Sequence, residues 1–312
     1  MLVAFLVVTG LGMRSTYDSL GVATCLAATP ARDCTMLFSQ FQNQYSSLQF
    51  LIPLFLLLPV LLGIFWGAPL IAREVEQGTY RLAWTQSVTR RRWTVTKLFI
   101  VGSVAVILSA VFSAVLWWWA DPLVGDPSVQ RFKYGIFDLL GVVPVAYTLF
   151  AVALGVAAGV VLRRTTVAMV ATLCGFAVAR LAVELVLRPN YQRAVTAAYP
   201  LSFSSKTGPP DGAWVLAENT VTASGFAVGG DSSGISLSYV PMQHLCPYLT
   251  PDSAPGSAAM QQCLTQNGIH VVATFQPYDR YWLFQGIESA LFIVLAIALA
   301  LFSVWWVRRR VR

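Results

Sequence analysis

The residues of this chain that could do chemistry inside a folded protein are few, and most of them are charged. Arg180 and Glu184 are four positions apart in a long apolar stretch, so on a helix they share one face and can pair. Charged groups at membrane depth are costly and usually face a bundle interior or a wet cavity. Two interpretations stay open: a substrate path or gate, and a structural ion pair. Glu288, near the start of the last apolar stretch, has the same two interpretations.

Motifs for catalysis, nucleotide binding and metal binding are missing from the sequence. No GxxxxGK phosphate loop, HExxH or CxxC occurs. His244 and His270 are 26 positions apart, and His244 with Cys246 supplies only two ligands, fewer than a metal site needs. We therefore predict that this chain is not an enzyme and holds no cofactor or metal of its own.

The composition places these charges in a membrane protein. The chain is 56% hydrophobic and 11% charged, whereas a soluble domain averages roughly 25% charged residues. Its longest apolar runs are long enough, as helices, to cross a hydrocarbon core of about 30 Å. They lack the alternation of polar and apolar residues that is typical of barrel strands, so we expect helices. The predicted spans are Leu51–Ala72, Leu98–Trp119, Leu139–Leu162, Thr166–Leu187 and Trp282–Val307.

The N-terminal run Met1–Met13 is too short to cross, because a helix of this length covers only about 20 Å. It lacks the basic region and cleavage site of a signal peptide, so we interpret it as the outer part of a first helix whose beginning is missing from this chain. The expected fold class is an all-α polytopic membrane protein with six transmembrane helices, the first one truncated. We expect kinks at the prolines inside the spans, Pro53, Pro59, Pro69 and Pro144.

The basic residues set the predicted orientation. Of the 21 Lys and Arg residues, twelve fall on one side of the predicted topology, and short loops rich in them stay cytoplasmic. The segment 73–97 and the C-terminus are therefore predicted to face the cytoplasm, in the plasma membrane. The net charge of +7 follows from this asymmetry and gives no argument for nucleic-acid binding. The terminal arginines suit a surface of anionic lipid.

The connection 188–281, predicted to lie outside, is 94 residues long and should form a small α/β or β-rich domain. GISLSYV (Gly234–Val240) and IHVVATF (Ile269–Phe275) look like short strands. The chain then divides into transmembrane helices one to five with the cytoplasmic segment (1–187), the outer domain (188–281), and the last helix with its basic tail (282–312).

Cysteine positions agree with this topology. Cys25 and Cys34 lie in the first outer connection and Cys246 and Cys263 in the large one, as expected for disulfides in an oxidising compartment. Pairing within each connection is the simplest hypothesis, and cross-pairing stays open. Cys174, inside a span, is interpreted as a packing residue.

The segment GAPLIAREVEQGTYRLAWTQSVTRRRWTVTK (Gly67–Lys97) is predicted to be cytoplasmic. It is longer and richer in charged and aromatic residues than a simple connection between two helices, which needs only a few polar residues. Acidic residues are followed by a glycine turn, aromatic groups and arginines. The segment has the length for a short surface helix whose bulky groups insert into a partner. An interfacial anchor with Trp84 and Trp93 at headgroup depth would look similar.

This order of residues resembles the permease subunits of type-2 ABC exporters (the ABC-2 type). FQPYDRYWLFQGIE (Phe275–Glu288) and the terminal WWVRRR resemble the end of the last span in actinobacterial members. In that family, the connection after the second helix forms a coupling helix that docks on the ATPase. The resemblance implies ATPase coupling through Glu74, Glu76, Gly78, Thr79, Tyr80, Arg81 and Trp84. It implies headgroup anchoring by Arg90, Arg91, Arg92 and Trp93.

What the resemblance implies is a permease without its own ATP site. Two permeases, identical or different, would pair in the bilayer, and two soluble ATPase subunits holding ATP and Mg would drive export of a hydrophobic or amphiphilic substrate. The basic, Trp-containing segment with which the family usually begins is not present here. Two alternatives stay open: an ion-coupled secondary transporter, and a membrane-anchored sensor or assembly protein whose outer domain binds a ligand.

Overall fold

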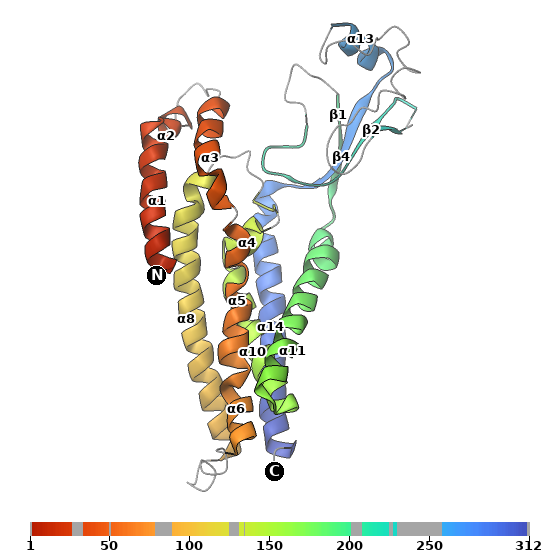
Figure 1. Cartoon of the computed structure of the whole chain (residues 1–312). Coiled ribbons are helices and arrows are strands. Elements are labelled where there is room, and N and C mark those ends of the chain that lie inside the picture. The colour runs from red at the N-terminus through yellow and green to blue at the C-terminus, as the bar shows by residue number, and fades with distance from the viewer. Residues whose placement is uncertain are drawn as a thin grey trace. The chain divides into compact units, whose positions relative to one another are not determined.

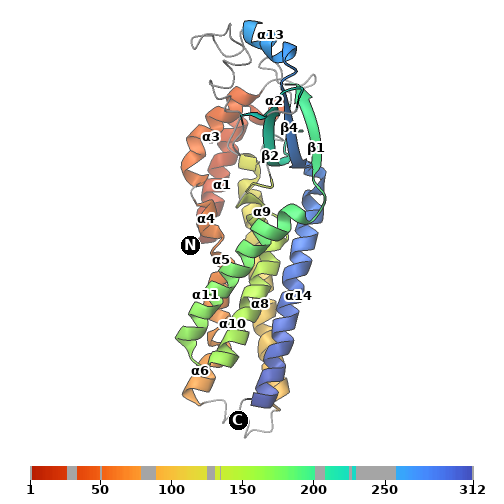
Figure 2. The ribbon, with the colours of Figure 1, turned by 90° about the vertical axis from the view of Figure 1, so that its right-hand side faces the viewer.

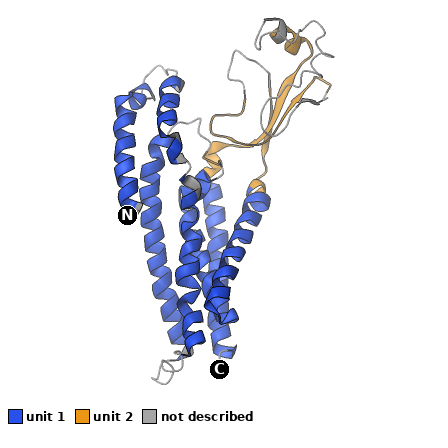
Figure 3. Cartoon of the chain, viewed as in Figure 1, with its two compact units in different colours: residues 1–126, 133–188, 282–312 blue, residues 127–132, 189–281 orange. Residues whose placement is uncertain are grey.

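A computed structural model of the chain describes residues 2–26, 34–49, 51–78, 89–124, 131–133, 135–200, 208–224, 227–229 and 258–310. The chain divides into two compact units (Figure 3). Unit 1 contains Met1–Asp126, Lys133–Arg188 and Trp282–Arg312, and unit 2 contains Pro127–Phe132 and Pro189–Tyr281.

Unit 1 is built from helices (Figure 1). Its N-terminal part contains α1 (Leu2–Ser19), α2 (Val22–Leu26), α3 (Thr35–Gln49), α4 (Ile52–Phe55), α5 (Leu58–Leu62), the π turn η1 (Gly63–Gly67) and α6 (Pro69–Gln77). The rest contains α8 (Arg90–Val124), α9 (Ile136–Leu139), α10 (Val143–Leu162), α11 (Thr165–Ala182), the π turn η2 (Val183–Leu187), the 3-10 turn η3 (Arg188–Asn190) and α14 (Tyr281–Arg310).

Five helical stretches are long and apolar enough to cross a membrane, and each overlaps one of the five complete spans predicted from the sequence. They are Leu58–Gln77, Arg91–Val124, Val143–Leu162, Thr165–Asn190 and Tyr278–Arg310. Helix α1 extends to Ser19, beyond its predicted end at Met13, and is not among these stretches in the described part of the chain. The sixth span stays a prediction.

Prolines divide the chain between Ile52 and Gln77 into short helices. Pro53, Pro59 and Pro69 lie in the first turns of α4, α5 and α6, and Pro144 lies in the first turn of α10. Proline lacks the N–H that a helix interior needs but suits a first turn, whose N–H groups have no partner inside the helix. The expected irregularities therefore take the form of new helix starts.

Glycines let this broken helix approach α10 closely. A Cβ atom on Gly155 would lie 2.4 Å from the carbonyl oxygen of Gly63, and one on Gly159 would lie 2.6 Å from that of Ala68. Gly63 and Gly67 have the same four-residue spacing and face the backbone of α10. Small residues at this spacing allow helix backbones to touch in a membrane, where packing must supply the attraction.

We predict that Gly155→Ala destabilises the chain by about 1–3 kcal/mol, because the methyl group forces the two backbones apart. Thermal unfolding of the purified protein in detergent measures the effect. Gly102→Ala in α8 is the matched control, since a Cβ there meets nothing within 4 Å. Equal melting temperatures for the two variants would contradict the close packing.

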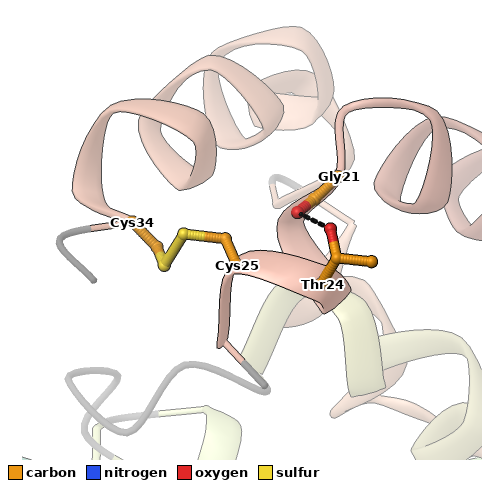
Figure 4. The surroundings of a disulfide bond; sticks show 4 residues. All are labelled: Gly21, Thr24, Cys25 and Cys34. Atoms are coloured by element: carbon orange, nitrogen blue, oxygen red, sulfur yellow. Dashed lines mark hydrogen bonds between the residues drawn. A yellow bond between two sulfur atoms is a disulfide. The ribbon is translucent and has the colours of Figure 1, made fainter. Parts of the chain in front are cut away.

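Polar contacts join α1 to α8 and to α3 in unit 1, and a disulfide links α2 to the start of α3. Trp119 of α8 donates from Nε1 to Thr9 of α1 at 3.0 Å, and the hydroxyl of Tyr45 on α3 donates to the carbonyl of Gly12 at 3.2 Å. A disulfide joins Cys25 to Cys34 (Figure 4), the pairing within one connection that the sequence favoured. It links the end of α2 to the residue before α3.

Unit 2 contains a four-stranded antiparallel sheet with strand order β1-β4-β2-β3. Its elements are β1 (Val195–Pro200), β2 (Trp214–Val221), β3 (Ala227–Gly229), α13 (Ala258–Gln266), β4 (His270–Gln276) and the 3-10 turn η4 (Tyr278–Arg280). Strand β4 overlaps the predicted strand Ile269–Phe275, whereas Gly234–Val240 lies outside the described residues. Cys263 is disulfide-bonded, and Cys246 lies outside the described residues.

Candidate functional site

Six polar side chains from six elements of unit 1, all of them buried except the partly buried Arg180, meet at one place, which we call the ion network. Figure 2 shows α9, α10, α11 and α14, the helices that carry four of its members. The ion network consists of Asp138 (α9), Tyr147 (α10), Arg180 (α11), Glu184 (η2), Arg188 (η3) and Glu288 (α14).

Arg188 is the centre of the ion network. Its Nη2 donates to Asp138 Oδ1 at 2.5 Å and to Glu288 Oε1 at 2.8 Å, and its Nε donates to Glu288 Oε2 at 2.9 Å. The side chain is only 2% exposed, and its two carboxylate partners are fully buried. Two donor atoms facing one carboxylate form the strongest kind of charged hydrogen bond. The guanidinium also lies over the ring of Phe137, 4.3 Å from its centroid.

The pair predicted from the sequence lies beside this centre. Arg180 Nη2 donates to Asp138 Oδ2 at 2.7 Å and is 3.6 Å from Glu184 Oε2, while Arg188 Nη1 is 3.8 Å from Glu184 Oε1. Asp138 therefore binds both arginines, and Glu184 lies beyond hydrogen-bond distance of them. Glu288, which the sequence suggested without a partner, enters the same network through Arg188.

Asp138 and Tyr147 complete the arrangement. The Tyr147 hydroxyl lies 3.0 Å from Asp138 Oδ1, contacts Glu288 Oε1 and accepts from Arg188 at 3.3 Å. Burial raises the pKa of Asp138, but the charges of Arg188 and then Arg180 outweigh burial and hold this pKa below its usual range. Asp138 is therefore ionised and serves as the fixed anion between two guanidinium groups.

One turn before Glu288, a buried glutamine fixes the connection between α9 and α10. Gln285 Oε1 accepts from the N–H groups of Val142 and Val143, both at 3.2 Å, and its Nε2 donates to the carbonyls of Phe137 and Leu140. The amide thereby satisfies backbone groups at the end of one helix and the start of the next. Gly141, with φ of 101°, leaves space for the Gln285 amide, because a Cβ atom at this position would lie 2.6 Å from Gln285 Oε1.

Sequence reasoning missed half of the ion network. Asp138 and Arg188 lie just beyond predicted span ends, so both were counted as loop residues. The spacing of Arg180, Glu184 and Arg188 at four-residue intervals was the available signal, because it places all three on one helix face. Tyr147 gave no signal in the sequence.

The glutamates predicted to contact an ATPase have partners within unit 1. Glu74, near the end of α6, pairs with Lys97 of α8, whose ammonium lies over the Trp93 ring, 4.4 Å from its centroid. Glu76 accepts from both the N–H and the hydroxyl of Thr165, at 3.1 and 2.8 Å, at the start of α11. The end of α6 is therefore joined to the first turn of α11 and to the N-terminal part of α8.

The connection between α6 and α8 is described only at its ends. Gly78 ends α6 with φ of 72°, a conformation that favours glycine, as expected for the predicted turn. Trp93, predicted as a headgroup anchor, is half-buried against an apolar cluster that includes Ile71 and Val307. Arg91 and Arg92 are exposed. The predicted coupling residues Thr79, Tyr80, Arg81 and Trp84, and the side chain of Arg90, lie outside the described residues.

A protein-family model described as "ABC-2 membrane transporter related" matches residues 1–188. The chain belongs to this family. The match covers most of the chain's helical unit, and it includes every member of the ion network except Glu288. No curated protein and no solved structure matches the chain. The chain is thus a membrane protein of the ABC-2 transporter class.

We predict that Arg188→Met destabilises this ABC-2 family member by about 3–5 kcal/mol, because it leaves buried carboxylates without their main counter-charge. Thermal unfolding in detergent measures the loss. Arg193→Met, at an exposed arginine of unit 2, should change stability by less than about 0.5 kcal/mol. Similar melting temperatures for the two variants would show that the ion network is not structural.

Proposed function

We propose that this chain is the membrane-spanning permease subunit of an ATP-driven exporter. The observation that carries the proposal is the ABC-2 family match over residues 1–188. The chain has no GxxxxGK motif, so ATP and Mg would be bound by a separate ATPase subunit. The permease would pair with a second permease, identical or different, in the plasma membrane.

In this proposal the segment 73–97, which contains the connection between α6 and α8, is the coupling segment on which the ATPase docks. The contacts at its two ends support this role. Glu74 joins α6 to α8 through Lys97, and Glu76 joins α6 to α11 through Thr165. A push on the coupling segment would therefore act on three helices at once. Contact of these two glutamates with the ATPase itself stays a prediction from the resemblance.

The proposed orientation places the coupling segment and the C-terminus in the cytoplasm and unit 2 outside. The distribution of Lys and Arg supports it, since the exposed Arg91, Arg92, Arg164 and Arg308–Arg310 all lie on the proposed inner side. The apolar spans suit a hydrophobic or amphiphilic substrate.

The family match favours this function over the two alternatives. A secondary transporter usually contains repeated halves, and none is evident in the sequence. A sensor would not need the charged, aromatic connection between α6 and α8.

We predict that an ATP-binding subunit co-purifies with the tagged full chain from its native membranes, and that Tyr80→Ala/Trp84→Ala lowers its recovery about tenfold or more. The reason is that buried aromatic anchors dominate binding energy at interfaces. Quantitative mass spectrometry of the eluate measures the recovery.

Glu218→Ala in unit 2 is the control and should leave the recovery unchanged. If no ATP-binding subunit is recovered with the wild-type chain, or if the double variant retains it fully, the proposed coupling is wrong.

A further inference from the structure

The ion network has an uneven charge count. Its three carboxyl groups belong to Asp138, Glu184 and Glu288, and its two guanidinium groups belong to Arg180 and Arg188. With every group ionised the formal charge would be −1. An uncompensated charge at this depth is expensive, so buried charged groups normally occur in balanced sets or become neutral.

Distances identify the carboxyl group that is not compensated. Asp138 and Glu288 each receive guanidinium hydrogen bonds of 2.9 Å or less. Glu184 has only the longer contacts to Arg180 and Arg188, at 3.6 and 3.8 Å. Its side chain is 7% exposed, and its Oε2 is buried with no hydrogen-bond partner among the described residues. This oxygen faces the network and lacks a donor.

A compensating cation would need room beside Glu184. The cavity lined by Asp138 and Tyr147 has a volume of about 10 Å³, roughly the space of one water molecule, and Glu184 is not among its lining residues. No group of acidic, His or Cys side chains in the described part of the chain is arranged to hold a metal ion. A proton needs no cavity, because it adds to an existing oxygen.

We propose that Glu184 is a proton-binding site and that its carboxyl group is neutral in the conformation seen here. A proton taken from water forms an O–H bond on the carboxylate and brings the charge of the ion network from −1 to zero. The charged groups acting on Glu184 are Arg180 and Arg188 from its own helical stretch, Asp138 from α9 and Glu288 from α14. Glu184 also lies in the π turn η2, a feature frequent at functional sites.

Release of this proton would give the two arginines three anions to share. Arg180, which lies between Asp138 and Glu184, would be drawn toward Glu184 and away from α9. The Arg180–Asp138 ion pair between α11 and α9 would weaken. The bound proton therefore stabilises the position of the end of α11. This inference does not depend on the transport proposal, since it concerns the purified chain alone.

Infrared spectroscopy of the purified full chain tests the proposal, because a protonated carboxyl group has its own C=O stretching band. We expect this band in the wild-type protein at neutral pH and its loss in Glu184→Gln. Asp279→Asn, at an exposed position of unit 2, should retain it. A wild-type protein without the band, or a band that persists in Glu184→Gln, would overturn the proposal.

Thermal unfolding provides a second readout. Glutamine mimics a neutral carboxyl group, so Glu184→Gln should melt within about 1 °C of wild type at neutral pH, whereas Glu288→Gln should melt roughly 5 °C lower. The folded wild type holds a proton that the unfolded chain releases, so its stability should fall as the pH rises. That fall should be smaller in Glu184→Gln. The reverse order of the two variants would place the proton on Glu288 and refute the assignment.

Discussion

The helical unit of this protein is organised around a buried guanidinium group. Arg188 is almost completely enclosed, and its partners Asp138 and Glu288 come from positions 50 and 100 residues away in the chain. A buried charge is tolerated only when its partners are in place, and removing one of them costs far more than a surface ion pair contributes. The ion network therefore fixes which helix ends meet, whereas the apolar surfaces between spans allow many arrangements.

The helical stretch from Thr165 to Arg188 makes polar contacts at both of its ends, and these contacts relate the ion network to the proposed transport cycle. Thr165, at the start of α11, is bound by Glu76 of α6, and the stretch ends in the ion network at Arg188. A helix transmits displacement along its axis better than a loop, because its backbone hydrogen bonds resist bending. In the proposed mechanism, movement of the coupling segment would reach the ion network along this stretch.

The sequence predicted the elements of unit 1 better than their contacts. Length and hydropathy located the five long spans, and prolines located their breaks, because these signals are local. Helix spacing paired Arg180 with Glu184, but nothing local connects either of them to Asp138 or Glu288. Long-range pairing depends on which helix faces meet, and lipid-facing and protein-facing sides of these helices are both apolar. The close approach at Gly155 depends on which backbone lies opposite, and the four-residue spacing of Gly155 and Gly159 in the sequence does not specify that.

A double-mutant cycle of Arg188→Met and Glu288→Met tests the central claim most directly, with unfolding free energy measured for both single variants and the double variant. If the two side chains compensate each other inside the protein, the double variant is more stable than the sum of the single losses by about 1–3 kcal/mol. Losses that simply add would contradict the account, because they would mean that each side chain contributes to stability independently of the other.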